Sequence, residues 1–286
     1  MSRALGDRVV GQARLGGGID ADTHAIALES GTTVVLRQPL NTAWDELDRH
    51  ARVLETVVAH DVPAPRLLAV DATGGDAGRP SLLMSLLPGT ARLPEVADDD
   101  YLRSLAQMAA ALHSVTGPGL EWMGDRVDRV RTLVSEPPPR ELDEPAMRAW
   151  EALGADPEAL GESTGCLTHV DFWSGNTLRE RTTVTGVIDW SNAATGRPEV
   201  DVAECAFDLS VSRGLAVGRR FIALYGELTE SALESVEAWL AVCVVRSTDL
   251  AEWLPGWAGL GLDVASELAF QRRERVLEAA LEGLRG

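Results

Sequence analysis

The chain has 286 residues, of which 45% are hydrophobic, so it is long enough for roughly two domains of about 150 residues and a large core. Its 26 basic and 44 acidic residues give a formal net charge of −18, which repels nucleic acid and anionic membranes and favours a cationic partner. All basic residues are arginine, and the absence of lysine excludes a P-loop nucleotide site and Schiff-base chemistry, both of which need an amine side chain.

The first forty residues predict three short strands. They are separated by glycine turns and lie at residues 8–15, 23–29 and 32–37. The first turn contains Gly17 and Gly18, where glycine lets backbone N–H groups approach phosphates. Hairpin turns are rich in glycine in any case, so the turn alone does not distinguish a nucleotide site from an ordinary hairpin.

The segment 44–59 predicts a helix, because Leu47, Ala51, Leu54 and Val58 repeat at spacings of three and four. Further elements follow in chain order: strands at 66–70 and 81–86, a helix at 99–114, and a helical region at 117–165 that a run of prolines interrupts. Beyond residue 190 the chain is predicted to be mainly helical, at 200–209, 215–226, 231–250 and 264–284.

A compact polar block lies between strands in the middle of the chain. After a short apolar entry, a loop carries His169, Asp171 and Asn176. A β-branched strand at 182–190 then ends on Asp189, and a hairpin would bring this residue back toward Asn176. Such a set suits phosphoryl transfer, in which one Asp accepts the proton of the acceptor hydroxyl while an Asn and a second Asp hold Mg²⁺ on the phosphates. The alternative is a polar turn that is capped by its own side chains.

This block resembles the aminoglycoside phosphotransferase and choline kinase-like family, whose members carry an H-G-D-x4-N loop followed by an I-D-W or I-D-F strand end. The four polar residues match position by position, and Val170 stands where the family has Gly. The segment 196–203 also looks like the family's G-D-P-x-x-D-L-A, which places Asp201 at the start of a helix. Arg197 replaces the first Asp of that segment, and we infer no site from it.

The resemblance implies an α+β, two-lobed protein kinase-like fold. Residues 1–87 would form a small nucleotide-binding lobe with an antiparallel sheet and the hinge at its end. Residues 88–286 would form a larger, mainly helical lobe that carries catalysis and acceptor binding. ATP or GTP would be the phosphoryl donor, with Mg²⁺ as the metal.

The resemblance also assigns roles to the polar block. Asp171 would be the catalytic base or the residue that orients the hydroxyl, and Asn176 and Asp189 would be the metal ligands. His169 and Asp201 would support the catalytic loop, His169 by hydrogen bonding.

For the nucleotide, the resemblance places Arg37 where the family's third strand carries a phosphate-binding Lys. Arginine can also bind phosphate, although its larger fork changes the geometry. The helix Glu that orients this cation in the family falls at His50, and Glu46, one turn earlier, could reach Arg37 instead. Backbone groups of Ser85 and Leu87 would meet the adenine edge at the hinge.

Helices of the large lobe build the acceptor pocket in the resembled family. Candidate acids for a cationic acceptor are Glu204, Asp208, Asp249 and Glu252, although solvated helix faces look the same. A late group of tryptophans could form an aromatic wall, but large aromatic side chains are more often core, and we expect core positions for Trp239, Trp253 and Trp257. His113 is expected to be a helix-terminal charge or a packing residue.

The function predicted from these features is an ATP- or GTP-dependent phosphotransferase that modifies a hydroxyl of a small molecule, an antibiotic of the aminoglycoside, macrolide or peptide type. One alternative is a kinase of a cell metabolite such as choline, a sugar or homoserine. Another is a catalytically silent nucleotide-binding pseudokinase, which Arg37 and His50 would motivate. The sequence predicts no nucleic-acid or membrane partner and leaves the oligomeric state open.

Three cysteines, at 166, 205 and 243, are few and far apart, and the sequence shows no leader pattern and no long apolar run. We therefore expect a reduced, cytoplasmic setting without disulfides. A zinc site at Cys166, His169 and Asp171 is not expected, because no second pair of ligands accompanies them.

Overall fold

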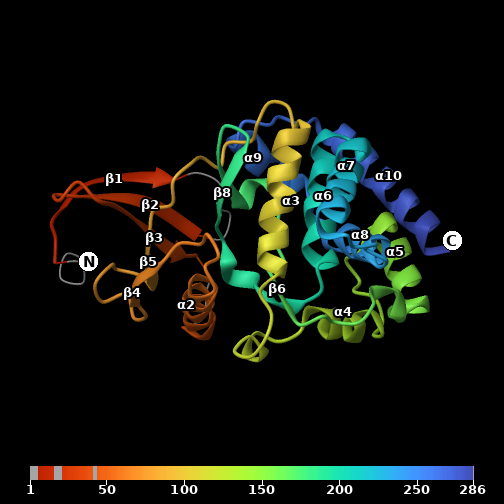
Figure 1. Ribbon diagram of the computed structural model, residues 1–286, viewed down its shortest axis with the longest axis horizontal. Helices are drawn as coiled ribbons and strands as arrows, with labels where there is room; N and C mark the ends of the chain where they lie inside the picture. Colours follow the sequence, from red (N-terminus) through yellow and green to blue (C-terminus); the bar gives the residue numbers. More distant parts are fainter. Residues whose placement is uncertain (1–5, 16–20, 41–43, 286) are drawn as a thin grey trace.

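The computed structural model describes residues 6–15, 21–40 and 44–285, so Gly17 and Gly18 lie outside the described residues. The N-terminal part is an antiparallel sheet of five strands in the order β1-β2-β3-β5-β4 (Figure 1). Its strands are β1 (Val9–Leu15), β2 (Ala21–Leu28), β3 (Thr33–Pro39), β4 (Leu67–Asp71) and β5 (Ser81–Ser85). Between β3 and β4 the chain forms helix α2 (Trp44–Ala59), which lies beside the inner end of the sheet.

Alternation along the strands gives this sheet two packed faces. Val34 and Leu36 of β3 join a small cluster with Ile26, whereas Val35 belongs to the main core together with Leu54 of α2. Successive side chains of a strand point to opposite faces, so one strand contributes to both clusters. The predicted helix face at 44–59 is confirmed, since its apolar residues face the core and are buried or half-buried.

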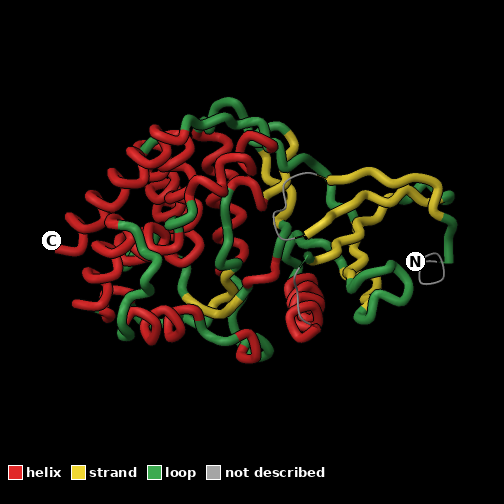
Figure 2. Tube along the Cα trace, turned by 180° about the vertical axis from the view of Figure 1, so that it is seen from behind, coloured by secondary structure: helices red, strands yellow, loops and turns green. Residues whose placement is uncertain are grey.

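The C-terminal part is mainly helical (Figure 2). Its helices are α3 (Asp99–His113), α4 (Arg126–Val134), α5 (Glu144–Ala155), α6 (Glu199–Arg213), α7 (Leu215–Thr229), α8 (Val236–Arg246), α9 (Leu250–Gly259) and α10 (Ser266–Arg285). Helix α6 packs against α7, α8 and α10 and is buried from its first residue to Ser212. Because α6 is central, the acids that it carries lie in the interior and not on a solvated face.

The chain also forms two short antiparallel strand pairs outside the five-stranded sheet. The predicted hairpin is confirmed: β7 (Thr177–Glu180) pairs with β8 (Thr183–Val187). Strand β6 (Cys166–Thr168) pairs with β9 (Ala194–Gly196). Strand β9 was not predicted, because three residues ending in Gly carry no readable alternation.

The hairpin is bonded directly to the N-terminal part. The N–H of Val187 donates to the carbonyl of Pro63 at 2.8 Å. The Arg49 guanidinium of α2 donates to the carbonyl of Ser191 at 2.7 Å and also to that of Ala193. These bonds join α2 and the segment after it to the chain on either side of Asp189.

The predicted α+β architecture, with an N-terminal antiparallel sheet and a helical C-terminal part, is confirmed. The single helix predicted at 231–250 is wrong: α8 ends at Arg246 and α9 begins at Leu250. Ser247, Thr248 and Asp249 interrupt it, since such side chains compete for backbone hydrogen bonds within a helix. A division of the chain at residue 87 stays a prediction. No helix within the described ranges is both long and apolar enough to cross a membrane.

Candidate active site

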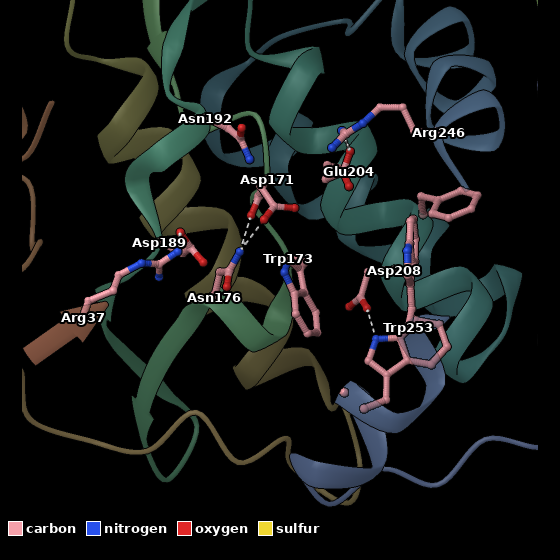
Figure 3. A pocket seen from close by; sticks show the side chains of 13 residues that line it. Arg37, Asp171, Trp173, Asn176, Asp189, Asn192, Glu204, Asp208, Arg246 and Trp253 are labelled. Atoms are coloured by element: carbon pink, nitrogen blue, oxygen red, sulfur yellow. Dashed lines mark hydrogen bonds and ion pairs between the residues drawn. The ribbon is translucent and has the colours of Figure 1, made fainter. Parts of the chain in front are cut away.

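The polar block and strand β3 contribute to one pocket of about 300 Å³ (Figure 3). Asp171 comes from the loop after β6, Asn176 from the turn before β7, and Asp189 from the segment after β8. Arg37 reaches the same pocket from β3. The pocket thus combines two carboxylates, a carboxamide and a guanidinium, the groups that phosphoryl transfer needs to accept a proton and to bind metal and phosphate.

Hydrogen bonds fix the orientation of these groups. The Nδ2 group of Asn176 donates to the carbonyl of Asp171 at 2.9 Å and to its Oδ2 at 2.8 Å. The carboxamide oxygen of Asn176 therefore faces away from Asp171 and is available to a cation. The N–H of Ile188 donates to the Asn176 carbonyl at 2.9 Å, which holds Asp189 next to this turn.

Asp189 occupies a left-handed backbone conformation, with φ 63° and ψ 59°. Its carboxylate pairs with Arg37 at 2.9 Å and accepts a hydrogen bond from the Ser191 hydroxyl at 3.0 Å. Burial disfavours the charged form, but Arg37 outweighs it and lowers the pKa of Asp189. Burial raises the pKa of Asp171, with His169 and Arg246 opposing the rise. The environments of the two carboxyls thus push their pKa values apart, which suits Asp171 to accept a proton and Asp189 to stay charged.

A carboxylate of α6 fixes the backbone of the loop that carries Asp171. Asp201 is fully buried, and its carboxylate accepts the N–H groups of His169 and Val170, each at 2.7 Å. His113 donates from Nε2 to the same carboxylate at 3.1 Å, and the Tyr225 hydroxyl lies 2.8 Å from its Nδ1. His113 is therefore a buried packing residue that supports Asp201.

His169 links the catalytic loop to the strand end that carries Asp189. Its Nε2 donates to the carbonyl of Ile188 at 2.9 Å, and its ring packs edge-on against Trp190 with centroids 4.6 Å apart. The ring is fully buried. These contacts are the ones that a supporting role for His169 requires, and none of them leads to the pocket.

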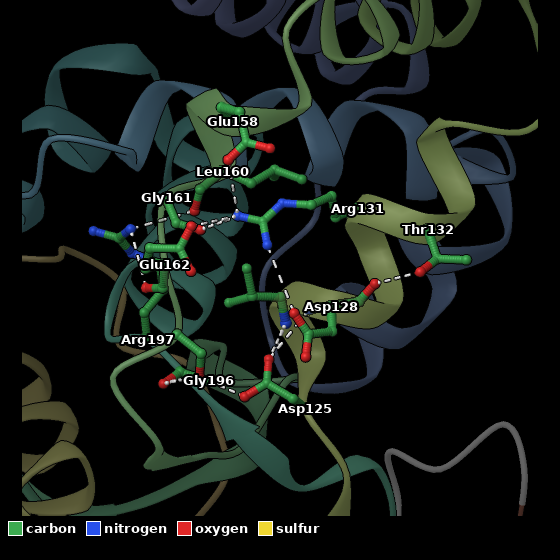
Figure 4. Close-up of polar contacts among 12 residues, drawn as sticks. Asp125, Asp128, Arg131, Thr132, Glu158, Leu160, Gly161, Glu162, Gly196 and Arg197 are labelled. Atoms are coloured by element: carbon green, nitrogen blue, oxygen red, sulfur yellow. Dashed lines mark hydrogen bonds and ion pairs between the residues drawn. The ribbon is translucent and has the colours of Figure 1, made fainter.

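Arg197 anchors the start of α6. Its guanidinium pairs with Glu199 at 2.6 Å and reaches the carbonyls of Leu160 and Glu162 at 3.4 Å (Figure 4). The residue thus ties the loop before β6 to the helix that carries Asp201. Arg197 stands where the family has an acid, and its contacts here are to other parts of the protein fold.

The partner of Arg37 differs from the one expected from the sequence. The ion pair of Arg37 is formed with Asp189, whereas Glu46, in the first turn of α2, is exposed. His50 is buried one turn later, and burial together with the Arg37 charge lowers its pKa to about 4. A neutral His50 cannot form an ion pair with the Arg37 guanidinium. Asp189 is the residue that forms this ion pair.

At the predicted hinge, Ser85 is already bonded within the sheet. Its N–H donates to the Arg66 carbonyl at 2.8 Å, and its hydroxyl accepts the Arg66 N–H at 2.9 Å. The side chain of Leu87 packs close to Gly186, where a Cβ atom would lie 2.8 Å from Leu87 Cδ1. A side chain at Gly186 would therefore force the end of the Leu87 side chain to move.

The second half of the pocket is formed by α6, α8, α9 and the catalytic loop. It is lined by Glu204, Asp208, Arg246, Trp173, Trp253 and Trp257. Two of the four predicted acceptor acids are thus in the pocket, whereas the other two, Asp249 and Glu252, are exposed and do not line it. The latter pair lies where α8 ends and α9 begins, a break that helical periodicity did not show.

The acids and aromatics of this half are tied together. Trp257 donates from Nε1 to Asp208 at 3.0 Å, and burial raises the pKa of Asp208 to about 7. The expectation of a core position is confirmed for Trp239 and Trp257, which are both buried in the main core. Trp239 donates to the Leu160 carbonyl. Trp253 instead lines the pocket, as does Trp173, whose only sequence signal was its position within the motif.

The donor set fits a metal that is shared with phosphates. No group of three or more His, Cys, Asp or Glu side chains able to hold a metal ion is found among the residues that the structure describes. Asn176 and Asp189 contribute an amide oxygen and a carboxylate to the lining of the same pocket. Mg²⁺ is commonly held by one or two such oxygens plus substrate phosphates, so these two residues fit that ion.

The chain is similar to known phosphotransferases. The profile of the phosphotransferase enzyme family (APH) matches residues 11–239. The apoenzyme of macrolide 2'-phosphotransferase MphH from Brachybacterium faecium is similar in structure, with 22% identity, a TM-score of 0.65, and coverage of 99% of this chain and 96% of that chain.

Two aminoglycoside phosphotransferases are also similar in fold. A thermostable mutant of APH(4)-Ia in ternary complex with ADP and hygromycin B has 16% identity and a TM-score of 0.67, with coverage of 100% and 97%. The GDP complex of aminoglycoside 2'-phosphotransferase-IIIa has 19% identity and a TM-score of 0.58, with coverage of 94% of both chains. No curated protein sequence matches significantly. Because the family profile covers most of its length, the chain belongs to the phosphotransferase enzyme family.

Proposed function

We propose that this protein transfers the γ-phosphoryl group of ATP or GTP to a hydroxyl of a small molecule, an antibiotic of the macrolide or aminoglycoside type. The observation that carries the proposal is the convergence of Asp171, Asn176, Asp189 and Arg37 on one pocket. The similar structures with bound ADP or GDP support a nucleotide donor, and those named for macrolides and aminoglycosides support the acceptor class.

In the proposed reaction, Asp171 orients the acceptor hydroxyl and takes its proton. The hydroxyl oxygen forms a bond to the γ-phosphorus as the bond from that phosphorus to the β–γ bridging oxygen breaks, and the nucleoside diphosphate leaves. Asn176 and Asp189 would hold Mg²⁺, which when bound neutralises charge on the phosphates. Arg37 lies at the same edge of the pocket, where its guanidinium would contact phosphate oxygens.

The remaining nucleotide contacts are proposals of the same kind. Main-chain groups of Ser85 and Leu87 would meet the base, and Gly17 and Gly18, outside the described residues, would lie near the phosphates. The acceptor would occupy the other half of the pocket, against Asp208 and the tryptophans. A cytoplasmic setting and Mg²⁺ as the natural metal belong to this proposal as well.

An acceptor screen tests the function directly. The purified protein is incubated with Mg²⁺ and ATP or GTP and a panel of aminoglycosides and macrolides, with choline and homoserine for comparison, and products are analysed by mass spectrometry. We expect one phosphoryl group on an antibiotic and loss of at least about 100-fold in rate for Asp171→Asn. The matched control Asp249→Asn alters an exposed acid and should keep the rate.

Two results would contradict the proposal. Phosphorylation of choline or homoserine alone would make the protein a metabolite kinase. A thermal shift with nucleotide but no product from any acceptor would indicate a silent nucleotide-binding protein.

A further inference from the structure

The peptide that leads into Asp171 has an unusual conformation. Val170 adopts φ 69° and is buried. Positive φ is a genuine outlier for a β-branched residue, because its Cβ is crowded there. Such a conformation persists only where the surrounding structure holds it in place. The contacts of this residue therefore bear directly on the placement of Asp171.

Both main-chain polar groups of Val170, its N–H and its carbonyl, are hydrogen-bonded to side chains. On one side Asp201 accepts the N–H of Val170, as described above. On the other side the Arg246 guanidinium of α8 donates from Nη1 to the Val170 carbonyl at 3.2 Å. The carbonyl of Val170 belongs to the same peptide group as the N–H of Asp171. Arg246 therefore restrains the orientation of the peptide plane that immediately precedes the Asp171 side chain.

Arg246 is itself anchored within the protein. Its Nη1 is 2.5 Å from Oε2 of Glu204, a buried residue of the central helix α6. Burial raises the pKa of Glu204 while Arg246 opposes the rise, and the Glu204 carboxylate in turn is the main cause of the raised pKa of Arg246. The Arg246 side chain is 34% exposed and lines the pocket that contains Asp171. Figure 3 shows the pair on the side of Asp171 that is remote from Arg37.

We propose that Arg246, anchored by Glu204, is a positioning residue that holds the strained Val170–Asp171 peptide and thereby aims the Asp171 carboxylate at the acceptor hydroxyl. The inference rests on the proposed function and adds a residue that lies outside the motif. It also gives Glu204 a role different from the acceptor contact expected from the sequence, since its carboxylate is engaged by Arg246.

Kinetics of Arg246→Gln test this role. We expect kcat to fall roughly 10- to 100-fold, as for a displaced catalytic group, with the KM values for nucleotide and acceptor nearly unchanged. Arg246→Lys should recover part of the rate, because an ammonium group can also donate to a carbonyl. The double variant Arg246→Gln/Glu204→Gln removes the buried pair as a whole and keeps the test valid if Arg246→Gln alone is unstable.

A matched control is available on α10. Arg272 also bonds main-chain carbonyls, those of Val211 and Ser212 at 3.2 and 2.7 Å, but does not line the pocket. Arg272→Gln should therefore leave kcat unchanged. A fall in kcat as large as that of Arg246→Gln would show a general effect on folding and overturn the proposal.

The strain itself supplies the sharper test. Glycine tolerates positive φ without the steric cost, so in a Val170→Gly background the peptide needs less support. The loss caused by Arg246→Gln should then shrink to less than about one third of its value in the parent chain. An unchanged loss, or a rise in acceptor KM with normal kcat, would overturn the positioning role and make Arg246 a ligand contact.

Hydrogen exchange separates this inference from the proposed function. Amide exchange of the peptide spanning 168–173 should speed up in Arg246→Gln, and less so in Arg246→Gln/Val170→Gly, whether or not an acceptor is known. If the parent chain transfers no phosphoryl group, the proposed function fails. Amide exchange of residues 168–173 still tests whether Arg246 restrains the Val170–Asp171 peptide. Exchange equal to that of the parent would overturn it.

Discussion

Asp201 offers the most direct energetic test of how the catalytic loop is held. Its carboxylate is 0% exposed and accepts three hydrogen bonds, from the N–H groups of His169 and Val170 and from His113 Nε2. Asparagine keeps the shape but replaces one acceptor oxygen by an NH2 group. One buried donor would then face another donor.

The expected cost follows from these contacts. A buried donor without an acceptor costs about 1–3 kcal/mol, and the bonds that remain lose their charge assistance, roughly 1 kcal/mol more. We therefore expect Asp201→Asn to lower the free energy of unfolding by about 2–4 kcal/mol. Urea unfolding, followed by circular dichroism, measures this difference from the midpoint at constant slope.

Asp249→Asn serves as the matched control, because Asp249 is exposed and outside the pocket. Its effect should stay within about 0.5 kcal/mol. If the midpoint of Asp201→Asn shifts no more than that of the control, then the carboxylate does not hold the loop and the account of its backbone is wrong.

Three further outcomes are expected. Arg37→Met should weaken nucleotide binding about tenfold in calorimetry, because a desolvated cation is lost from the phosphate side of the pocket; an unchanged Kd would contradict the placement of Arg37. Asp208 has its pKa raised to about 7, so the folded state holds the proton more tightly, and stability relative to Asp208→Asn should fall as pH rises from about 4 to 7 and level off above that. Unfolding at a series of pH values checks this, and a parallel pH profile for both chains would refute it. Trp253→Ala should raise the acceptor KM about tenfold without changing the nucleotide KM in steady-state kinetics, and an equal rise in both would point to a fault in folding.

Local features of the site could be predicted from the sequence because they depend on short-range geometry. Asn176 and Asp189 are joined by one hairpin, so their proximity follows from strand length and a tight turn. The buried face of α2 likewise follows from residue spacing alone. The break between α8 and α9 was missed, because residue spacing was the only guide and the apolar periodicity continues across the break.

Long-range partners could not be predicted in this way. Whether Arg37 meets Glu46 or Asp189 depends on how α2 is turned against the sheet, and no local pattern encodes that rotation. Acids on a buried helix and acids on a solvated helix look alike in a sequence, so Asp208 and Asp249 could not be told apart. Arg246 lies far from the motif in the chain, and its bond to the loop arises only from the packing of α8 on α6.

The bonds from Arg49 and Pro63 to the chain around Asp189 have a mechanical consequence. They tie α2 and the segment after it to the chain that carries Asp189, one of the two residues proposed to hold the metal. A displacement of α2 would therefore act on the backbone around Asp189 directly, through these hydrogen bonds. Under the proposed function, a molecule that shifts α2 would alter the cation site without occupying the place of either substrate, and its inhibition would be non-competitive with both.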